Sequence, residues 1–357
     1  MPQDVEFEVP FPSRTSPHAA AARARNLTWA HRYGLLGSAE AEQRYRFSQV
    51  AECGSYCYLD VAGDDLDLLF DVMGWFFLFD DQFETRCPQR IAKATAACQE
   101  HILVVSSPPG APALATRPTA VAFADCWRRM CEGTTPRWRA RTAHAWVDYF
   151  TGQLAEVADG LSRQELDFET HLARRRQTIG VFPSLCLAER TGHLDVPDLA
   201  WHSTHLKQMQ QAAVDQVICV NEVFSLEKEE AHGSPNLIHD LMRQRGYDRV
   251  WAIHYMRDLA DRRMQEFVAL DQQLPQLCER LCLTETESRA VVRYSQLVGY
   301  WLRGNYDWHR ATGRYRQVST VQGGKEYLGA LTTEDLSTPK DHPAQPASTE
   351  GSPASGG

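Results

Sequence analysis

Two adjacent carboxylates and a third one turn later follow one of the most apolar runs of this chain. The stretch "WFFLFDDQFE" places Asp80, Asp81 and Glu84 directly after four aromatic residues and a leucine. Residues four apart share one face of a helix, so Asp80 and Glu84 point the same way, with Asp81 beside them. Mg²⁺ binds through one or two carboxylates plus the phosphates of a substrate, which makes this a candidate metal site. A solvated helix end is the alternative for this motif taken alone.

A second set of oxygen donors lies further along the chain, in "NEVFSLEKE". Asn221, Ser225 and Glu229 are spaced four residues apart. On a helix they fall within an arc of about 80° and span roughly 12 Å. A carbonyl, a hydroxyl and a carboxylate oxygen then lie on one stripe. Lys228 adjoins this stripe and is placed to reach an anion held by a metal. The alternative is an exposed helix end with mixed charges.

These two motifs together resemble those of the class I terpene synthases, and "SLEKEE" is especially similar to the bacterial sesquiterpene cyclases. The resemblance extends over nearly the whole chain. It implies three Mg²⁺ ions, held by Asp80, Glu84, Asn221, Ser225 and Glu229. Glu84 and Glu222 stand where aspartate is common in these enzymes. Neither exchange removes an oxygen donor, but both leave the product open.

The same resemblance assigns residues that bind the diphosphate of a substrate. The family carries an arginine 46 residues before the motif asparagine, and Arg175 stands there in "HLARRRQTIG". It also carries an Arg–Tyr pair after the last long helix, here Arg314 and Tyr315, which would act together with Lys228. Thr178 and Ile179 correspond to a helix break that relays diphosphate binding to the substrate, and the glycine that follows makes a break plausible. Without the resemblance, three consecutive arginines indicate a solvated basic face.

The reaction implied by the resemblance is ionisation of a prenyl diphosphate, with farnesyl diphosphate favoured, followed by cyclisation of the allylic cation. The first ring closure would be of the 1,11 type. An aromatic face stabilises a desolvated cation by about 0.5–2 kcal/mol. The candidates for this role are Phe76, Phe77, Trp301 and Trp308, with His309 placed to influence proton loss. Each aromatic residue is also explained as ordinary core, because large bundles bury many such side chains.

Helical periodicity dominates the chain between its breakers, and alternating strand patterns are scarce. The segments with apolar residues at three- and four-residue spacing are 38–58, 64–84, 123–133, 206–229, 249–274 and 287–313. Segments 108–118 and 229–236 contain breakers and are predicted to be loops. Several of the helices are apolar over most of their circumference, which is typical of a large bundle that can hold a ligand between its helices.

The predicted fold is therefore all-α, and the resemblance specifies a single-domain class I terpenoid synthase bundle around a central aromatic-lined cavity. We expect an extended, proline-rich arm over residues 1–17, the cyclase domain over 18–330 and a disordered tail over 331–357. The tail assignment follows from a composition rich in Pro, Ser, Gly and Ala.

Composition excludes several classes of function. The 357 residues carry a net charge of −9, which argues against nucleic-acid binding because that needs a basic face. No run approaches the roughly 18 apolar residues of a membrane span, and no signal peptide is recognisable. The ten cysteines form no CxxC pair, so a reducing cytoplasm is the expected location. Both a monomer and a homodimer remain open.

Four alternatives compete with the cyclase interpretation. A chain-elongating prenyltransferase of the same fold normally has a second aspartate-rich motif where this chain has "NEVFSLEKE". A diterpene cyclase acting on geranylgeranyl diphosphate would share the motifs found here. A di-iron bundle requires two ExxH pairs, and Glu229 to His232 is the one found. A helical scaffold protein would need no pair of oxygen clusters facing one cavity.

Overall fold

The computed structural model describes residues 4–81, 83, 90–108, 114–162 and 165–315. Over these ranges the chain forms fifteen α-helices and no β-strand, so the prediction of an all-α fold is confirmed. The helices are α1 Ala19–Arg32, α2 Ala39–Ser48, α3 Cys53–Cys57, α4 Gly63–Asp80, α5 Arg90–Ser106, α6 Pro118–Cys131, α7 Pro136–Ser162, α8 Phe168–Thr178, α9 Val181–Thr191, α10 Asp198–Trp201, α11 Thr204–His232, α12 Leu237–Arg245, α13 Arg249–Gln272, α14 Leu274–Arg280 and α15 Glu285–Ala311.

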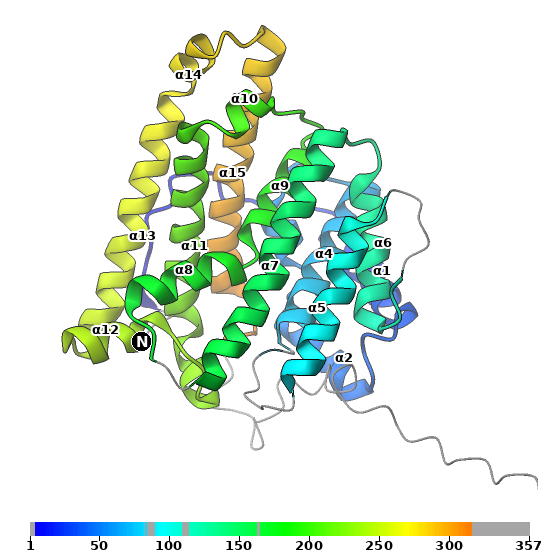
Figure 1. Cartoon of the computed structure of the whole chain (residues 1–357), viewed down its shortest axis with the longest axis vertical. Coiled ribbons are helices and arrows are strands. Elements are labelled where there is room, and N and C mark those ends of the chain that lie inside the picture. Colours follow the sequence, from blue (N-terminus) through cyan, green and yellow to red (C-terminus); the bar gives the residue numbers. More distant parts are fainter. Residues whose placement is uncertain (1–3, 82, 84–89, 109–113, 163–164, 316–357) are drawn as a thin grey trace, which may run out of the picture.

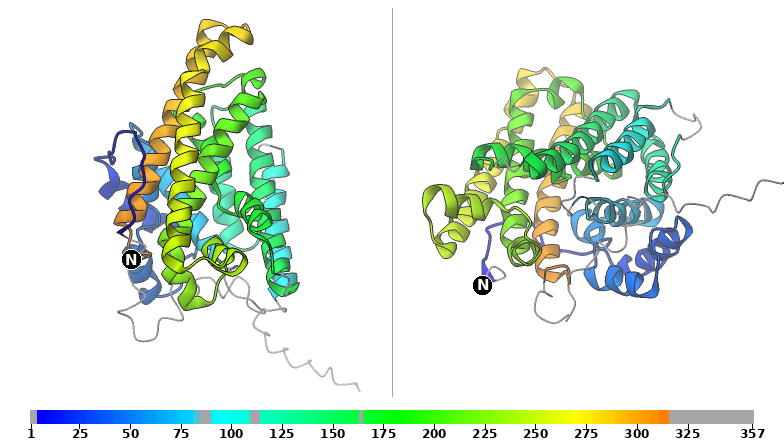
Figure 2. Two further views of the ribbon diagram at one scale, coloured as in Figure 1. Left: turned by 90° about the vertical axis from the view of Figure 1, so that its left-hand side faces the viewer. Right: turned by 60° about the horizontal axis from the view of Figure 1, so that its bottom comes forward.

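The long helices lie side by side along the longest axis of the molecule. Figure 1 shows α4, α5 and α7 on one side and α11, α13 and α15 on the other, with the shorter α8 crossing near the lower end. The right-hand view in Figure 2, turned so that the bottom of Figure 1 comes forward, shows the helices grouped around the middle of the bundle. This arrangement brings the last turn of α4 and the last third of α11 to the same end of the molecule.

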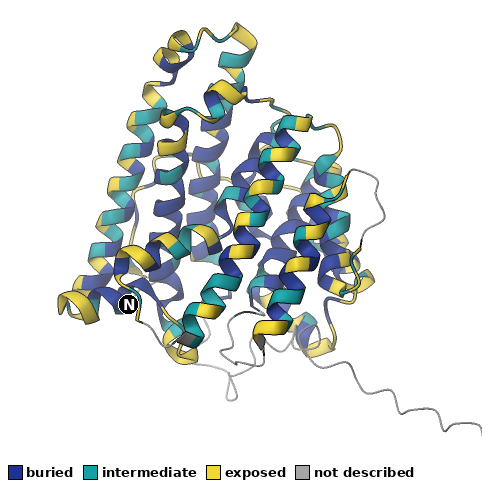
Figure 3. Cartoon of the chain, in the orientation of Figure 1, coloured by how far each residue is buried: buried dark blue, intermediate teal, exposed yellow. Residues whose placement is uncertain are grey.

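The two central helices, α4 and α11, are apolar over most of their surface. Every residue from 68 to 76 in α4 and from 212 to 220 in α11 is buried. A helix with this composition is stable only when other helices cover all its sides. Figure 3 shows the buried residues gathered on the inward faces of the bundle, with exposed residues on the outside. The motifs at the ends of α4 and α11 are therefore held by the best-packed part of the fold.

An aromatic cluster packs behind the acidic end of α4. Trp75 is fully buried and stacks on Phe123 at 4.5 Å and on Phe79 at 4.9 Å between ring centroids. Phe76 stacks in turn on Trp146 at 4.7 Å. Each such aromatic pair adds about 0.5–1.5 kcal/mol to the stability of the fold, beyond the contribution of the apolar area that it buries. The cluster fixes the orientation of α4 and with it the direction in which Asp80 points.

Several helix boundaries differ from the prediction: α4, for example, ends at Asp80 although the predicted segment was 64–84. Segment 38–58 shows helical spacing throughout, yet it forms two helices because Gln49 adopts a left-handed backbone with φ of 51° and ends α2. Segment 229–236 was expected to be a loop, but α11 continues to His232 and ends at Gly233 with φ of 66°. Glycine adopts this conformation without steric penalty, so it sets the end of the helix. As a result, the helix continues to His232, beyond Glu229.

The segment before α1 is not helical from residue 5 to 16 and runs against α13 and α15. The backbone N–H of Phe7 donates to the Tyr306 hydroxyl at 3.4 Å, and that of Glu8 donates to Asp261 at 3.0 Å. Phe7 is buried with the bundle core. Residues 331–357, predicted to be a disordered tail, lie outside the described residues. Among the described helices, none is long and apolar enough to cross a membrane.

Candidate active site

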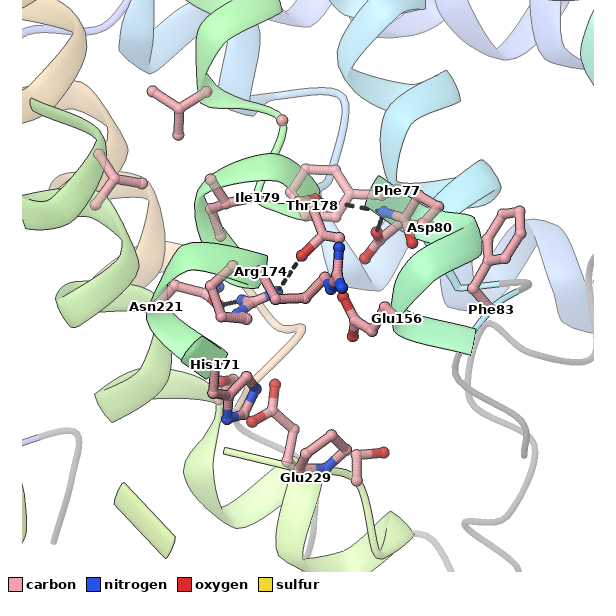
Figure 4. A pocket seen from close by; sticks show the side chains of 18 of the residues that line it. Phe77, Asp80, Phe83, Glu156, His171, Arg174, Thr178, Ile179, Asn221 and Glu229 are labelled. Carbon is pink, nitrogen blue, oxygen red and sulfur yellow. Dashed lines mark hydrogen bonds between the residues drawn. The ribbon is translucent and has the colours of Figure 1, made fainter. Parts of the chain in front are cut away.

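A cavity of about 580 Å³ lies among α4, α7, α8, α11 and α15. Of the residues predicted from the sequence, it is lined by Phe76, Phe77, Asp80, Arg175, Asn221, Ser225, Lys228, Glu229, Trp301, Trp308, His309, Arg314 and Tyr315. Figure 4 shows Asp80 and Asn221 approaching the pocket from opposite sides, with Glu229 further along the side of Asn221. Asp80 at the end of α4 and the oxygen-rich stripe of α11 therefore face one cavity.

At the end of α4, the two aspartates have different surroundings. The Asp80 carboxylate lines the cavity and accepts a hydrogen bond from the Gln153 side chain at 2.8 Å. Asp81 does not line the cavity: it is 1% exposed and accepts two hydrogen bonds from the Arg314 guanidinium at 3.0 and 2.5 Å. Adjacent helical residues point about 100° apart, which separates the two carboxylates. The sequence predicted a catalytic role for Asp81, whereas in the structure its carboxylate forms an ion pair with Arg314 and does not face the cavity. Glu84 lies outside the described residues.

On α11, the predicted stripe lines the cavity along its length. Asn221 accepts a hydrogen bond from Arg175 at 2.8 Å and donates one to the Tyr315 hydroxyl at 3.2 Å. The Ser225 hydroxyl oxygen is buried and has no hydrogen-bond partner within the described part of the chain. Desolvation by burial raises the pKa of Glu229 to about 7, and the negative charge of a neighbouring carboxylate adds to the shift. This half of the site therefore has one buried oxygen, that of Ser225, without a partner, and a carboxylate that burial makes easier to protonate.

The three consecutive arginines of α8 have three different partners. Arg174 pairs with an aspartate of α7 at 2.8 Å, and Arg176 pairs with the buried Asp215 at 2.7 Å. Arg175 donates to Glu222 at 2.7 Å and lines the cavity. Arg174 also lines the cavity, so what distinguishes Arg175 is its hydrogen bond to Asn221, and its selection as the diphosphate-binding arginine stays a prediction. Glu222, which the sequence showed only as a departure from the family pattern, holds this arginine.

The helix break expected at 178–180 is present. α8 ends at Thr178, and α9 begins at Val181 after Gly180, whose φ is 73°. A Cβ at Gly180 would lie 2.8 Å from a ring carbon of Phe76. Both the backbone conformation and the close packing require glycine here. The break therefore lies directly against the aromatic wall of the cavity.

The end of α15 closes the aromatic side of the cavity. Trp308 is anchored by a hydrogen bond from its ring N–H to the Gln49 carbonyl at 2.8 Å, and Phe77 packs on it at 5.0 Å. His309 stacks on Tyr315 with ring centroids 5.3 Å apart. Burial lowers the pKa of His309 to about 4, so the imidazole is neutral at pH 7. A neutral ring can accept a proton, whereas an imidazolium cannot.

The di-iron alternative is not supported. His232 is held by the Lys228 carbonyl at 2.6 Å. Across the residues that the structure describes, no group of three or more His, Cys, Asp or Glu is placed to hold a metal ion. Any metal bound by the two stripes would therefore depend on the amide and hydroxyl oxygens of α11 as well as on carboxylates.

Residues 71–266 match the family described as terpene synthase family 2, C-terminal metal binding. This range contains both oxygen-rich motifs and covers more than half of the chain. The chain belongs to this terpene synthase family. It is accordingly an enzyme that acts on a prenyl diphosphate, with a metal as cofactor.

Relatives of this terpene synthase differ in the products for which they are named. The chain is 40% identical to pentalenene synthase of Streptomyces avermitilis over 343 residues, covering 92% of this chain and 99% of that protein. It is 42% identical to R-linalool synthase of Streptomyces clavuligerus over 334 residues, covering 94% and 98%. The sequence resemblance to the terpene synthases is thereby confirmed.

Solved structures show the same fold. The crystal structure of linalool/nerolidol synthase from Streptomyces clavuligerus in complex with 2-fluorogeranyl diphosphate matches with a TM-score of 0.79 and 40% identity. The match covers 87% of this chain and 100% of that structure. The class I terpene synthase bundle predicted from the sequence is therefore confirmed.

Helices α7 and α12 supply polar residues that sequence motifs did not reveal. Gln153 and Glu156, three residues apart on α7, both line the cavity, and Gln153 donates directly to Asp80 at 2.8 Å. Asn236, just before α12, donates to the Glu229 carboxylate at 2.7 Å. In the sequence, α7 shows only a pair of polar residues at helical spacing. Such a pair looks the same as a solvent-exposed helix face until the positions of the neighbouring helices are known.

Proposed function

We propose that this terpene synthase uses Mg²⁺ to ionise farnesyl diphosphate and cyclises the resulting cation to a sesquiterpene. The observation that carries the proposal is the convergence of Asp80, at the end of α4, and the oxygen-rich stripe of α11 on one cavity with aromatic walls. A volume of about 580 Å³ lies within the range of roughly 300–1,000 Å³ that is usual for small-molecule sites.

The oxygen donors fit Mg²⁺. Asp80, Asn221, Ser225 and Glu229 present carboxylate, amide and hydroxyl oxygens, which are ligands for hard cations. A buried hydroxyl without a partner is unfavourable by about 1–3 kcal/mol, and a cation would satisfy the Ser225 oxygen. Glu84, outside the described residues, would complete the set on α4. Bound Mg²⁺, for which we propose three ions, would neutralise the negative charge that develops on the departing diphosphate.

Basic side chains around the same mouth would bind the diphosphate. Arg175 and Arg314 carry planar guanidinium groups suited to phosphate oxygens, and Lys228 adds a third positive charge. Burial raises the pKa of Tyr315, so its hydroxyl stays protonated and able to donate. Asp81 holds Arg314 in place through their ion pair. These groups would orient the leaving group toward the metal side and the hydrocarbon toward the aromatic side.

The aromatic wall would fold the hydrocarbon and protect the cation. Phe76, Phe77 and Trp308 line the cavity, and each ring face stabilises a nearby cation by about 0.5–2 kcal/mol. Exclusion of water prevents premature capture. His309, neutral and beside Trp308 at 4.9 Å between ring centroids, is placed to accept a proton late in the reaction. A 1,11 first ring closure agrees with the similarity to pentalenene synthase.

A second candidate is formation of an acyclic C10 alcohol, which the 42% identity to R-linalool synthase favours as much as the 40% identity to pentalenene synthase favours cyclisation. The discriminating experiment incubates purified protein with Mg²⁺ and geranyl, farnesyl or geranylgeranyl diphosphate, followed by gas chromatography. A cyclic C15 product supports the proposal, and linalool alone supports the second candidate. A C20 ring or a longer linear diphosphate would indicate a diterpene cyclase or an elongating enzyme. Absence of products and of inorganic diphosphate with all three substrates would refute both candidates.

A further inference from the structure

Helix α7 reaches the mouth of the cavity because a glycine lets it approach the break between α8 and α9. A Cβ at Gly152 would lie 2.6 Å from the Gln177 Cβ and 3.4 Å from the Thr178 methyl. Any other side chain at Gly152 would push α7 away from the end of α8. The following residue, Gln153, is thereby placed between the end of α8 and the end of α4.

The Gln153 amide joins these two parts of the site. The side chain is 2% exposed. Its amide nitrogen donates to the Asp80 carboxylate at 2.8 Å and to the Thr178 carbonyl at 3.3 Å. A primary amide has two N–H donors, so one nitrogen can serve both acceptors. Figure 4 shows Asp80 and Thr178 facing each other across this short gap.

Thr178 also contacts the arginine proposed to bind diphosphate. A guanidinium nitrogen of Arg175 donates to the Thr178 hydroxyl at 3.3 Å. Arg175, Thr178, Gln153 and Asp80 therefore form a continuous chain of hydrogen bonds from α8, through α7, to α4. The chain connects the carboxylate side of the site to the helix break.

We propose that Gln153 is a positioning residue that holds the Asp80 carboxylate in its orientation for metal binding and ties that orientation to the Thr178 end of the helix break. The inference rests on the proposed function, because it assumes that Asp80 binds Mg²⁺. Without the amide, Asp80 loses the donor that fixes one of its oxygens, and the orientation of the carboxylate is less well defined. The break also loses its link to α4.

The test compares Gln153→Met with the wild type. Methionine keeps the length and most of the volume of the side chain but has no N–H donor. The first readout is thermal stabilisation by Mg²⁺ with inorganic diphosphate, which requires no turnover. We expect the Mg²⁺ concentration for half-maximal stabilisation to rise about tenfold or more, as for loss of a hydrogen bond to a charged group.

A second readout and a matched control separate positioning from a general loss of structure. The Mg²⁺ concentration for half-maximal turnover should rise in parallel, and high Mg²⁺ should restore part of the activity. Gln177→Met is the control, because Gln177 is an exposed glutamine of α8 whose amide oxygen accepts from Arg174 at 2.9 Å and does not contact Asp80. Its Mg²⁺ dependence should equal that of the wild type.

The outcomes distinguish this inference from the proposed function. If Mg²⁺ with diphosphate does not stabilise the wild type, the proposed function fails. If the wild type responds and Gln153→Met has the same half-maximal Mg²⁺ concentration, the positioning role is refuted while the function stands. If Gln153→Met does not fold, Gln153→Asn is measured in the same way; its shorter side chain keeps the donors but cannot reach both acceptors. A wild-type Mg²⁺ dependence in that variant also overturns the inference.

Discussion

Replacing Arg175 by lysine keeps the positive charge but removes the planar guanidinium. Arg175 donates to Glu222 at 2.7 Å, to Asn221 at 2.8 Å and to Thr178 at 3.3 Å. A lysine ammonium is a compact charge on a flexible stem, and it cannot reproduce this fork. If lysine makes two fewer charge-assisted hydrogen bonds to the diphosphate in the transition state, at about 1.5–3 kcal/mol each, kcat/KM should fall about 10²- to 10⁴-fold.

The assay measures release of inorganic diphosphate from farnesyl diphosphate in the presence of Mg²⁺. Arg176→Lys is the matched control, since Arg176 is the adjacent arginine and pairs with Asp215, away from the cavity. That variant should lose stability without a comparable loss of kcat/KM, and circular dichroism with thermal melting reports on the fold of both. Equal kcat/KM for Arg175→Lys and the wild type would refute the assignment of Arg175 as the diphosphate-binding arginine.

Three further predictions concern the rest of the site. Asn221→Ala should lower turnover more than about 100-fold while the circular dichroism spectrum stays unchanged. A loss of this size exceeds what is usual for a residue that only hydrogen-bonds to a metal ligand. Full activity would contradict the assignment of Asn221 as a metal ligand. Gly180→Ala should lower Tm by roughly 2–4 °C, because the left-handed backbone at this position is unfavourable for alanine by about 1–2 kcal/mol. It should also alter the product ratio, because the new Cβ meets Phe76. An unchanged Tm in calorimetry and unchanged products in chromatography would count against this. For His171, burial lowers the pKa, but the hydrogen bond to Asp240 and the negative charges of Glu222 and Asp240 together outweigh burial, so the pKa is raised above 6.5. The resulting stability is present below pH 6.5 and is lost as pH rises through the folded pKa. In His171→Gln, the free energy of unfolding measured in urea should decline less as pH rises. If it depends on pH as in the wild type, His171 does not cause the decline.

The sequence was informative wherever the relevant spacing lies within one helix. Asn221, Ser225 and Glu229 share a stripe because each is four residues from the next, and the structure places all three along the cavity. The same local rule predicted the helical class and the position of α4, although α4 ends at Asp80 and not at the end of the predicted segment 64–84. It failed at Gln49, whose left-handed backbone divides a segment with continuous helical spacing. It also misplaced the end of α11, since the glycine that ends this helix follows a polar run resembling a loop.

Contacts between helices were decided by the tertiary structure. Asp80 and Asp81 are equivalent in a four-residue pattern, yet one faces the cavity and the other is buried against Arg314. Gln153 has no motif, and its importance arises from the approach of α7 to α8 that Gly152 allows. Helical periodicity fixes the face on which a side chain lies, because it depends on 3.6 residues per turn. The partner opposite that face belongs to a distant part of the chain, and only the packing of the whole bundle determines which residue it is.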